Sequence, residues 1–135
     1  MHKVGIAGLG KLGLSWSLIL ASKGFEVHGV DINSENINSL KNGQLTISEK
    51  GCWSLFNDFN DKLNFYNSFD EIKIDLDYIF VVVPSPSLED NCFDSSYVVR
   101  ALKNIDSFLL SRNVCIYTNI VITSTVMPGE CDRFL

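Results

Sequence analysis

The 135-residue chain has the length of one domain, and its 46% apolar and 20% charged residues are an ordinary globular balance. Its formal charge is −5 and its lysines and arginines are scattered, which argues against a nucleic-acid partner because phosphate neutralisation dominates that affinity. It has no signal segment and no apolar stretch near the ~20 residues of a membrane helix, so we expect a cytoplasmic protein with no membrane partner.

Hydrophobic periodicity predicts strands and helices that alternate along the first part of the chain. Residues 3–7 have the pattern of a strand, and the helix that follows is expected to end at Gly24. A second strand is expected over residues 25–30, then a helix with Ser34 as its N-cap and residues 42–43 as its stop. The apolar positions assigned to the first helix are Leu12, Leu14, Trp16, Leu18, Ile19 and Leu20.

The middle of the chain is less regular but keeps the same alternation. Aromatic and apolar spacing predicts a short helix within residues 51–59, a third strand over 62–67 and a helical turn over 68–72. Residues 77–83 form a continuous apolar run, which is typical of a central parallel strand covered on both faces. Two prolines, Pro84 and Pro86, end this run because proline cannot donate to a sheet ladder.

The last part of the chain predicts one long helix and one more strand. The helix is expected over residues 94–110, capped by Asp94 or Ser95, and the strand over 113–123 with a break near 118–119. The chain stops inside a beginning helix, so we expect a fragment or the N-terminal domain of a longer protein. Alternating strands and helices predict an α/β fold: one Rossmann-like, doubly wound parallel sheet over residues 1–135, with helices on both faces.

Three glycines follow the first strand and precede the first helix. In a dinucleotide site Gly8 allows a tight turn, Gly10 lets the backbone approach a pyrophosphate, and Gly13 lets the helix lie close to the sheet. The amides at the helix start then hold the phosphates, with Lys11 as an added cation. Asp31, at the tip of the second strand, is placed to accept hydrogen bonds from the adenosine ribose, which favours NAD over NADP.

Each of these positions also has a purely structural interpretation. The glycines can serve a tight turn between packed elements, and Asp31 can be a turn residue before the next helix. Lys11 can be a solvated helix lysine. Four cysteines, at 52, 92, 115 and 131, show no CxxC or zinc spacing, so no metal site is expected.

Five segments in chain order give a resemblance to a known family. They are "GLGKLGL", "GFEVHGVDIN", "NGQLTISEKG", "DYIFVVVPSP" and "STVMPG". Over nearly its whole length the chain resembles the N-terminal, NAD-binding domain of the UDP-glucose/GDP-mannose dehydrogenase family. The resemblance implies an oxidoreductase that uses NAD to oxidise the C6 alcohol of a UDP- or GDP-sugar to a carboxylate through a cysteine thiohemiacetal. We expect the complete protein to be a homodimer.

The resemblance also implies roles for individual residues. Residues 83–87 would line the cofactor near the nicotinamide ribose, and residues 124–126 would lie beside the reacting centre. Thr125 corresponds to a catalytic threonine that helps to position water, and Ser124 is counted among the cofactor-binding residues. None of the four cysteines matches the family nucleophile, so these 135 residues should bind cofactor without oxidising a sugar. The expected cofactor-binding residues are Gly8, Leu9, Gly10, Lys11, Leu12, Gly13, Asp31, Asn36, Val83, Pro84, Ser85, Pro86 and Ser124.

The chain departs from the family at several positions. Lys11 replaces an aromatic residue and Asn36 replaces a basic residue, which predicts weaker or rearranged cofactor contacts. Residues 46–51 replace a Pro-Ile-Tyr-Glu-Pro-Gly stretch, and Thr123 replaces a charged residue. Other hypotheses are a noncatalytic NAD-binding module or truncated product, and a 3-hydroxyacid dehydrogenase, which would lack the paired "VPSP" and "STVMPG" strand ends. A methyltransferase is disfavoured by the third glycine, Gly13.

Overall fold

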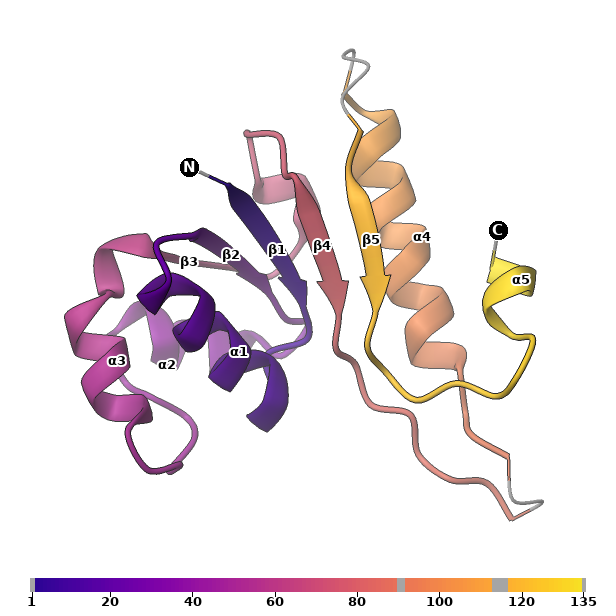
Figure 1. Ribbon diagram of the computed structural model, residues 1–135, viewed down its shortest axis with the longest axis horizontal. Coiled ribbons are helices and arrows are strands. Elements are labelled where there is room, and N and C mark those ends of the chain that lie inside the picture. Colours follow the sequence, from indigo (N-terminus) through magenta and orange to yellow (C-terminus); the bar gives the residue numbers. More distant parts are fainter. Residues whose placement is uncertain (1, 90–91, 113–116, 135) are drawn as a thin grey trace.

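The computed structural model describes residues 2–89, 92–112 and 117–134 (Figure 1). Within these ranges the chain forms a five-stranded sheet flanked by helices. The elements are β1 (Lys3–Ala7), α1 (Lys11–Ser22), β2 (Glu26–Val30), α2 (Ser34–Lys41), α3 (Cys52–Asp58), the 3-10 turn η1 (Asn60–Lys62), β3 (Leu63–Tyr66), the 3-10 turn η2 (Phe69–Glu71), β4 (Tyr78–Val81), α4 (Ser96–Leu110), β5 (Asn119–Ile122) and α5 (Cys131–Phe134).

All neighbouring strands run parallel, in the order β3-β2-β1-β4-β5. The chain builds the sheet outward from β1 to β3, then returns to the other side of β1 and builds outward again through β4 and β5. This confirms the predicted doubly wound α/β fold. The direction of building reverses between β1 and β4, so the loops after these two strands diverge and leave a crevice at their carboxyl ends.

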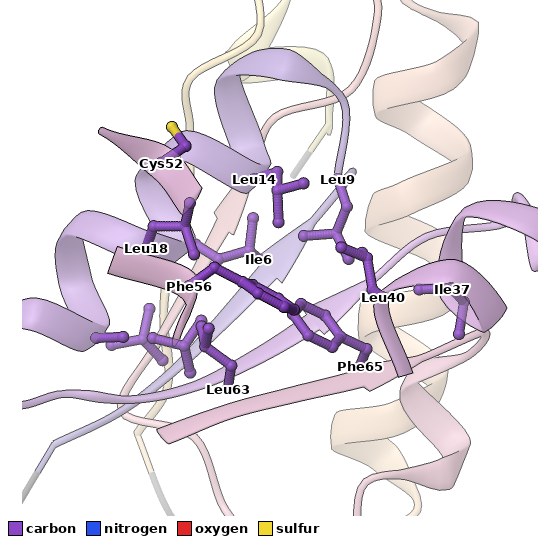
Figure 2. Close-up of a cluster of buried hydrophobic side chains, with 13 residues drawn as sticks. Ile6, Leu9, Leu14, Leu18, Ile37, Leu40, Cys52, Phe56, Leu63 and Phe65 are labelled. Atoms are coloured by element: carbon purple, nitrogen blue, oxygen red, sulfur yellow. The ribbon is translucent and has the colours of Figure 1, made fainter. Parts of the chain in front are cut away.

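Apolar side chains cover both faces of the sheet. Along β1, Val4 and Ile6 belong to a cluster with α1, α2 and α3, whereas Ala7 belongs to a second cluster with η2 and α4. This alternation follows from the period of two in a strand, and it explains why the central strands carry apolar runs instead of apolar and polar alternation. Figure 2 shows the first cluster, where Phe56 of α3 lies against Phe65 of β3.

The first helix packs on the sheet through only part of its apolar surface. Leu12 and Ile19, two of its apolar residues, are 57% and 48% exposed. The buried face contains instead the small residues Gly13, Ser17 and Ala21, together with Leu14 and Leu18. Small side chains let α1 approach the sheet closely, and the Ser17 hydroxyl is satisfied by donating to the Gly13 carbonyl at 2.8 Å.

The beginnings of two helices differ by one or two residues from the predicted positions. The N-cap of α2 is Asn33, not Ser34: its side-chain oxygen accepts from the amides of Glu35 and Asn36. The long helix α4 begins at Ser96, and the two residues predicted as its cap have different roles. Ser95 occupies the N-cap position, but its side chain makes no hydrogen bond to the helix amides, whereas the Asp94 carboxylate accepts from the Ser96 amide at 2.9 Å.

The other predicted elements are present with shorter bounds. The helix in 51–59, the strand in 62–67 and the turn in 68–72 correspond to α3, β3 and η2. The run 77–83 contributes Tyr78–Val81 to the sheet as β4, and the last strand, expected from residue 113, is described from Asn119. Residues 113–116, part of that expected strand, lie outside the described residues.

One histidine lies inside the sheet layer. His28 of β2 is 2% exposed, with Nε2 3.1 Å from Glu26 Oε1 and Nδ1 3.3 Å from the Tyr66 hydroxyl. Its ring stacks on the Tyr66 ring at a centroid distance of 5.8 Å. Burial lowers the pKa of His28, and Lys3 lowers it further, against the opposing effect of the Glu26 carboxylate. The native state therefore holds this imidazole neutral near pH 7.

This buried histidine predicts a loss of stability in mild acid. Because its pKa is lower in the native state than the ordinary 6.5, the unfolded chain binds the proton more readily, and the free energy of unfolding should fall as the pH drops below that value. Chemical denaturation at about pH 7.5 and about pH 5.5 measures the fall. We expect it to be smaller in His28→Phe, which keeps the stack on Tyr66. Equal falls in this variant and in the unmodified chain would contradict the assignment.

Candidate functional site

A cleft of about 530 Å³ opens at the carboxyl ends of the parallel strands. Its walls are the glycine turn after β1, the loop after β2, the segments after β3, β4 and β5, and one side of α4. This volume lies within the range of ordinary cofactor sites. The cleft lies where the strand order reverses, which is the place where open α/β sheets hold ligands.

The glycine turn forms the floor of the cleft, and its three glycines are needed for different reasons. Gly8 has φ of +100°, and a Cβ there would also collide with the Val82 carbonyl. A Cβ on Gly13 would collide with the Gly8 carbonyl, so α1 begins in direct contact with the turn. Gly10 differs, because a Cβ there would meet nothing within 4 Å and would project into open space. Gly8 and Gly13 are therefore required by the fold, whereas Gly10 keeps space free for a ligand.

The start of α1 is suited to an anion. Gly10 is its N-cap, with no side-chain hydrogen bond to the first turn and no acidic residue in that turn. The first intrahelical hydrogen bond runs from the Leu14 amide to the Gly10 carbonyl at 2.9 Å. The earlier amides of the helix have no intrahelical acceptor, and they add to the partial positive charge of the helix end. The open space at Gly10 and these amides together fit a diphosphate group.

Asp31 links the end of β2 to the glycine turn. Its Oδ2 accepts from the Leu9 amide at 2.7 Å, and its Oδ1 accepts from the Asn33 amide at 2.8 Å. Each carboxylate oxygen can accept a second hydrogen bond. The carboxylate is therefore fixed by the backbone and still able to accept hydroxyl groups from a ligand in the cleft.

Asn36 holds the other side of the same turn. Its Nδ2 donates to the Leu9 carbonyl at 3.1 Å, while its Oδ1 is enclosed without a hydrogen-bond partner. The residue lines a shallow hollow outside the turn instead of the cleft. Asn36 thus hydrogen-bonds the carbonyl of Leu9, and Asp31 hydrogen-bonds its amide. The Leu9 side chain is buried in the first core cluster.

Hydroxyl groups join the ends of β4 and β5. The Ser124 hydroxyl accepts from the Val83 amide at 2.9 Å and donates to the Val83 carbonyl at 2.8 Å, and the Thr123 hydroxyl donates to the Val81 carbonyl at 2.7 Å. Both hydroxyls therefore hold the two strand ends together. Thr125, by contrast, is exposed and lines the cleft.

The structure brings most of the predicted site residues to the cleft and leaves three outside its walls. Leu9 packs in the core, Asn36 faces the outer hollow, and Pro86 lies in the loop beyond β4, where its carbonyl accepts from the Asp94 amide. The predicted residues that line the cleft are Gly8, Gly10, Lys11, Leu12, Gly13, Asp31, Val83, Pro84, Ser85, Ser124 and Thr125.

Two walls of the cleft were not predicted from the sequence. One is α4, which contributes Tyr97, Arg100 and Asn104 from one side of the helix. The other is the region of Ile32, which is 68% exposed beside Asp31, and the segment that follows β3. The spacing of three and four residues between these α4 side chains was the available signal, since it places them on one helical face.

Lys11 is paired with an acid outside the cleft. Its ammonium nitrogen lies 2.7 Å from Glu49 Oε1, and this hydrogen bond and charge raise the pKa of Lys11. Glu49 belongs to the segment between α2 and α3 and does not line the cleft. The lysine itself lines both the cleft and the outer hollow.

The described residues contain neither a candidate metal site nor a helix suited to a membrane. Over residues 2–89, 92–112 and 117–134, no three His, Cys, Asp or Glu side chains converge as metal ligands would. In the same part of the chain, no helix has the length and apolar character that crossing a membrane requires.

Comparison with known proteins identifies relatives of this chain. Residues 2–135 match the UDP-glucose/GDP-mannose dehydrogenase family, NAD binding domain. The UDP-N-acetyl-D-mannosamine dehydrogenase of Methanococcus maripaludis is 38% identical over 140 residues, covering 98% of this chain and 30% of that protein. The GDP-mannose 6-dehydrogenase of Pseudomonas aeruginosa is 30% identical, covering 97% of this chain and 30% of that protein.

Solved structures show the same relationship. A ternary complex of GDP-mannose dehydrogenase from Pseudomonas aeruginosa superposes with a TM-score of 0.87 at 28% identity, over 97% of this chain and 30% of that one. The UDP-N-acetyl-mannosamine dehydrogenase of Staphylococcus aureus gives 0.85 at 32% identity, over 98% and 31%. The match along the chain confirms the resemblance seen in the sequence and sets aside the hydroxyacid dehydrogenase and methyltransferase hypotheses. The chain, which spans about 30% of the length of these relatives, belongs to the UDP-glucose/GDP-mannose dehydrogenase family and corresponds to its NAD-binding domain.

Proposed function

We propose that the cleft binds NAD with its diphosphate at the start of α1 and its adenosine ribose at Asp31. The observation that carries this proposal is the contrast among the three glycines: two are required by packing, and Gly10 alone keeps space open beside uncapped helix amides. A carboxylate fixed at the end of β2, beside the glycine turn, lines the same cleft. Phosphate at a helix N-terminus and ribose at an acid after the second strand are the two contacts that define dinucleotide binding in this fold.

The rest of the cleft suggests where the two ends of NAD lie. The adenine extends past Ile32 toward Tyr97 and Arg100 of α4, because these residues continue the wall beyond Asp31. An isoleucine gives an apolar surface for the base, and the arginine can stack on it as a planar cation. The nicotinamide end extends the other way, toward Val83–Ser85 and Thr125 at the ends of β4 and β5.

The carboxylate favours NAD over NADP. Both oxygens of Asp31 are held by backbone amides, so this side chain cannot turn away without losing the bonds to Leu9 and Asn33. A phosphate on the ribose would place negative charge against this fixed carboxylate, which is unfavourable. Asn36 supports the site indirectly, since it holds the Leu9 carbonyl and thereby the phosphate-binding turn.

In the longer protein, we propose that this domain serves the oxidation of the C6 alcohol of a UDP- or GDP-sugar to a carboxylate. NAD, when bound, supplies the hydride acceptor. The residues of this chain bind and orient: Ser124 fixes the segment after β4, and Thr125 is placed to hold a water or substrate hydroxyl. The family cysteine nucleophile has no counterpart among these 135 residues, so the chain alone binds NAD without forming NADH. A cytoplasmic location and a homodimer of the complete protein belong to the same proposal.

Removing the Asp31 charge tests the ribose assignment. In Asp31→Asn the charge-assisted hydrogen bonds to ribose are lost, so NAD affinity should fall by about 1.5–3 kcal/mol, roughly ten- to a hundredfold. The preference for NAD over NADP should fall with it, because the repulsion is removed. Calorimetric titration of both nucleotides measures the two effects, and denaturation of the variant shows whether the turn stays folded. Tighter binding of NADP than NAD by the unmodified chain would overturn the assignment.

The glycine turn offers a matched pair of alanine substitutions. Gly13→Ala should lower the free energy of unfolding by about 1–3 kcal/mol or more, because its Cβ meets the Gly8 carbonyl. Gly10→Ala should change that free energy by no more than ~0.5 kcal/mol, since its Cβ meets nothing. For NAD affinity the larger effect is expected from the other substitution: Gly10→Ala should weaken binding by about 1–3 kcal/mol, because its Cβ overlaps with the diphosphate. Full NAD affinity in Gly10→Ala would contradict the phosphate site.

A further inference from the structure

We propose that Glu49 competes with the dinucleotide diphosphate for the Lys11 ammonium and thereby sets the affinity of the cleft. This inference rests on the proposed function, because it concerns the phosphate end of the same site. It assigns a role to an acid that lies outside the cleft and is 38 residues from its partner along the sequence.

The position of Lys11 makes the competition geometrically reasonable. It is the first residue of α1 and directly follows Gly10, where the open space of the cleft begins. The residue lines both the cleft and the outer hollow. The flexible lysine stem can therefore carry the ammonium to either side.

Glu49 holds the ammonium on the outer side. The Nζ to Oε1 distance is 2.7 Å, and Glu49 lines a separate hollow with Ser15 and Cys52 instead of the cleft. The Glu49 carbonyl accepts from the Cys52 amide at 3.1 Å, which places this acid directly before α3. Because α3 packs into the first core cluster through Phe56, the backbone that carries Glu49 is attached to a fixed element.

The exposure of this pair makes the exchange easy. The Lys11 and Glu49 side chains are 75% and 46% exposed. An ion pair in such high-dielectric surroundings is weak, so little is lost when the ammonium leaves it. A diphosphate held by the amides of α1 carries more negative charge than one carboxylate and is fixed closer to the Lys11 backbone. The ammonium should therefore move from Glu49 to the ligand when NAD binds.

Neutralising Glu49 should tighten NAD binding. With Glu49→Gln, Lys11 is released before the ligand arrives, and NAD affinity should rise about two- to fivefold at low ionic strength. The gain should vanish at about 1 M salt, where the screening length is ~3 Å. Adenosine, which lacks the diphosphate, should bind the variant and the unmodified chain equally. Calorimetric titration of the whole chain with NAD and with adenosine measures these effects, and denaturation of each variant checks its fold.

Two controls separate competition from general electrostatics. Glu35→Gln removes the same charge from the outer hollow that Lys11 also lines, but from an acid that is not paired with Lys11, so NAD affinity should stay unchanged. In Lys11→Met the NAD affinity should fall, and adding Glu49→Gln to that variant should give no gain, because the two substitutions act through one pair.

Each outcome has a distinct meaning. Unchanged or weaker NAD binding in Glu49→Gln overturns the proposal and shows that the ion pair only fastens the segment before α3. An equal gain in Glu35→Gln, or a gain that persists in the Lys11→Met background, also overturns it. If the unmodified chain binds NAD but Glu49→Gln gives no gain, this inference fails and the proposed function stands. If the unmodified chain binds no NAD at all, both fail.

Discussion

The direct contact between Gly13 and the Gly8 carbonyl constrains most of what surrounds the cleft. It places the first turn of α1 on the turn that follows β1, so that uncapped amides and the open space at Gly10 face the same volume. Small residues at the following positions of the buried face, Ser17 and Ala21, keep the helix equally close to the sheet. The short distance between α1 and the turn after β1 thus gives both the close packing of the helix on the sheet and the open space where a phosphate could lie.

The same hydrogen bonds that hold the fold also shape the binding site. Asp31 joins β2 to the glycine turn through the Leu9 amide, and Ser124 joins β5 to the segment after β4 through Val83. Asp31 and Ser124 make these contacts and still line the cleft. Side chains fixed in this way lose little further freedom when a ligand arrives, which favours binding. Structural and functional interpretations of these residues are therefore compatible.

Membership of the family explains the fold and the cofactor, while two residues near the glycine turn differ from the family pattern and change its distribution of charge. Against the pattern that the sequence resemblance implies, Lys11 replaces an aromatic residue and Asn36 replaces a basic one. The first departure adds a cation beside the proposed diphosphate site, where it is paired with Glu49. The second leaves a neutral amide that donates to the Leu9 carbonyl. Relative to that pattern, positive charge is shifted from the proposed ribose side toward the proposed phosphate side.

The sequence alone determined the order of strands and helices, the glycine turn and the acid at the tip of β2. These features depend on local periodicity and on the special conformations of glycine, which neighbouring residues specify. The tertiary structure decided which face of α1 is covered, so the apolar residues Leu12 and Ile19 are exposed. It also decided that Tyr97 and Arg100 line the cleft and that Lys11 pairs with Glu49. Such contacts join segments far apart in the chain, and only the packing of helices on a twisted sheet brings them together.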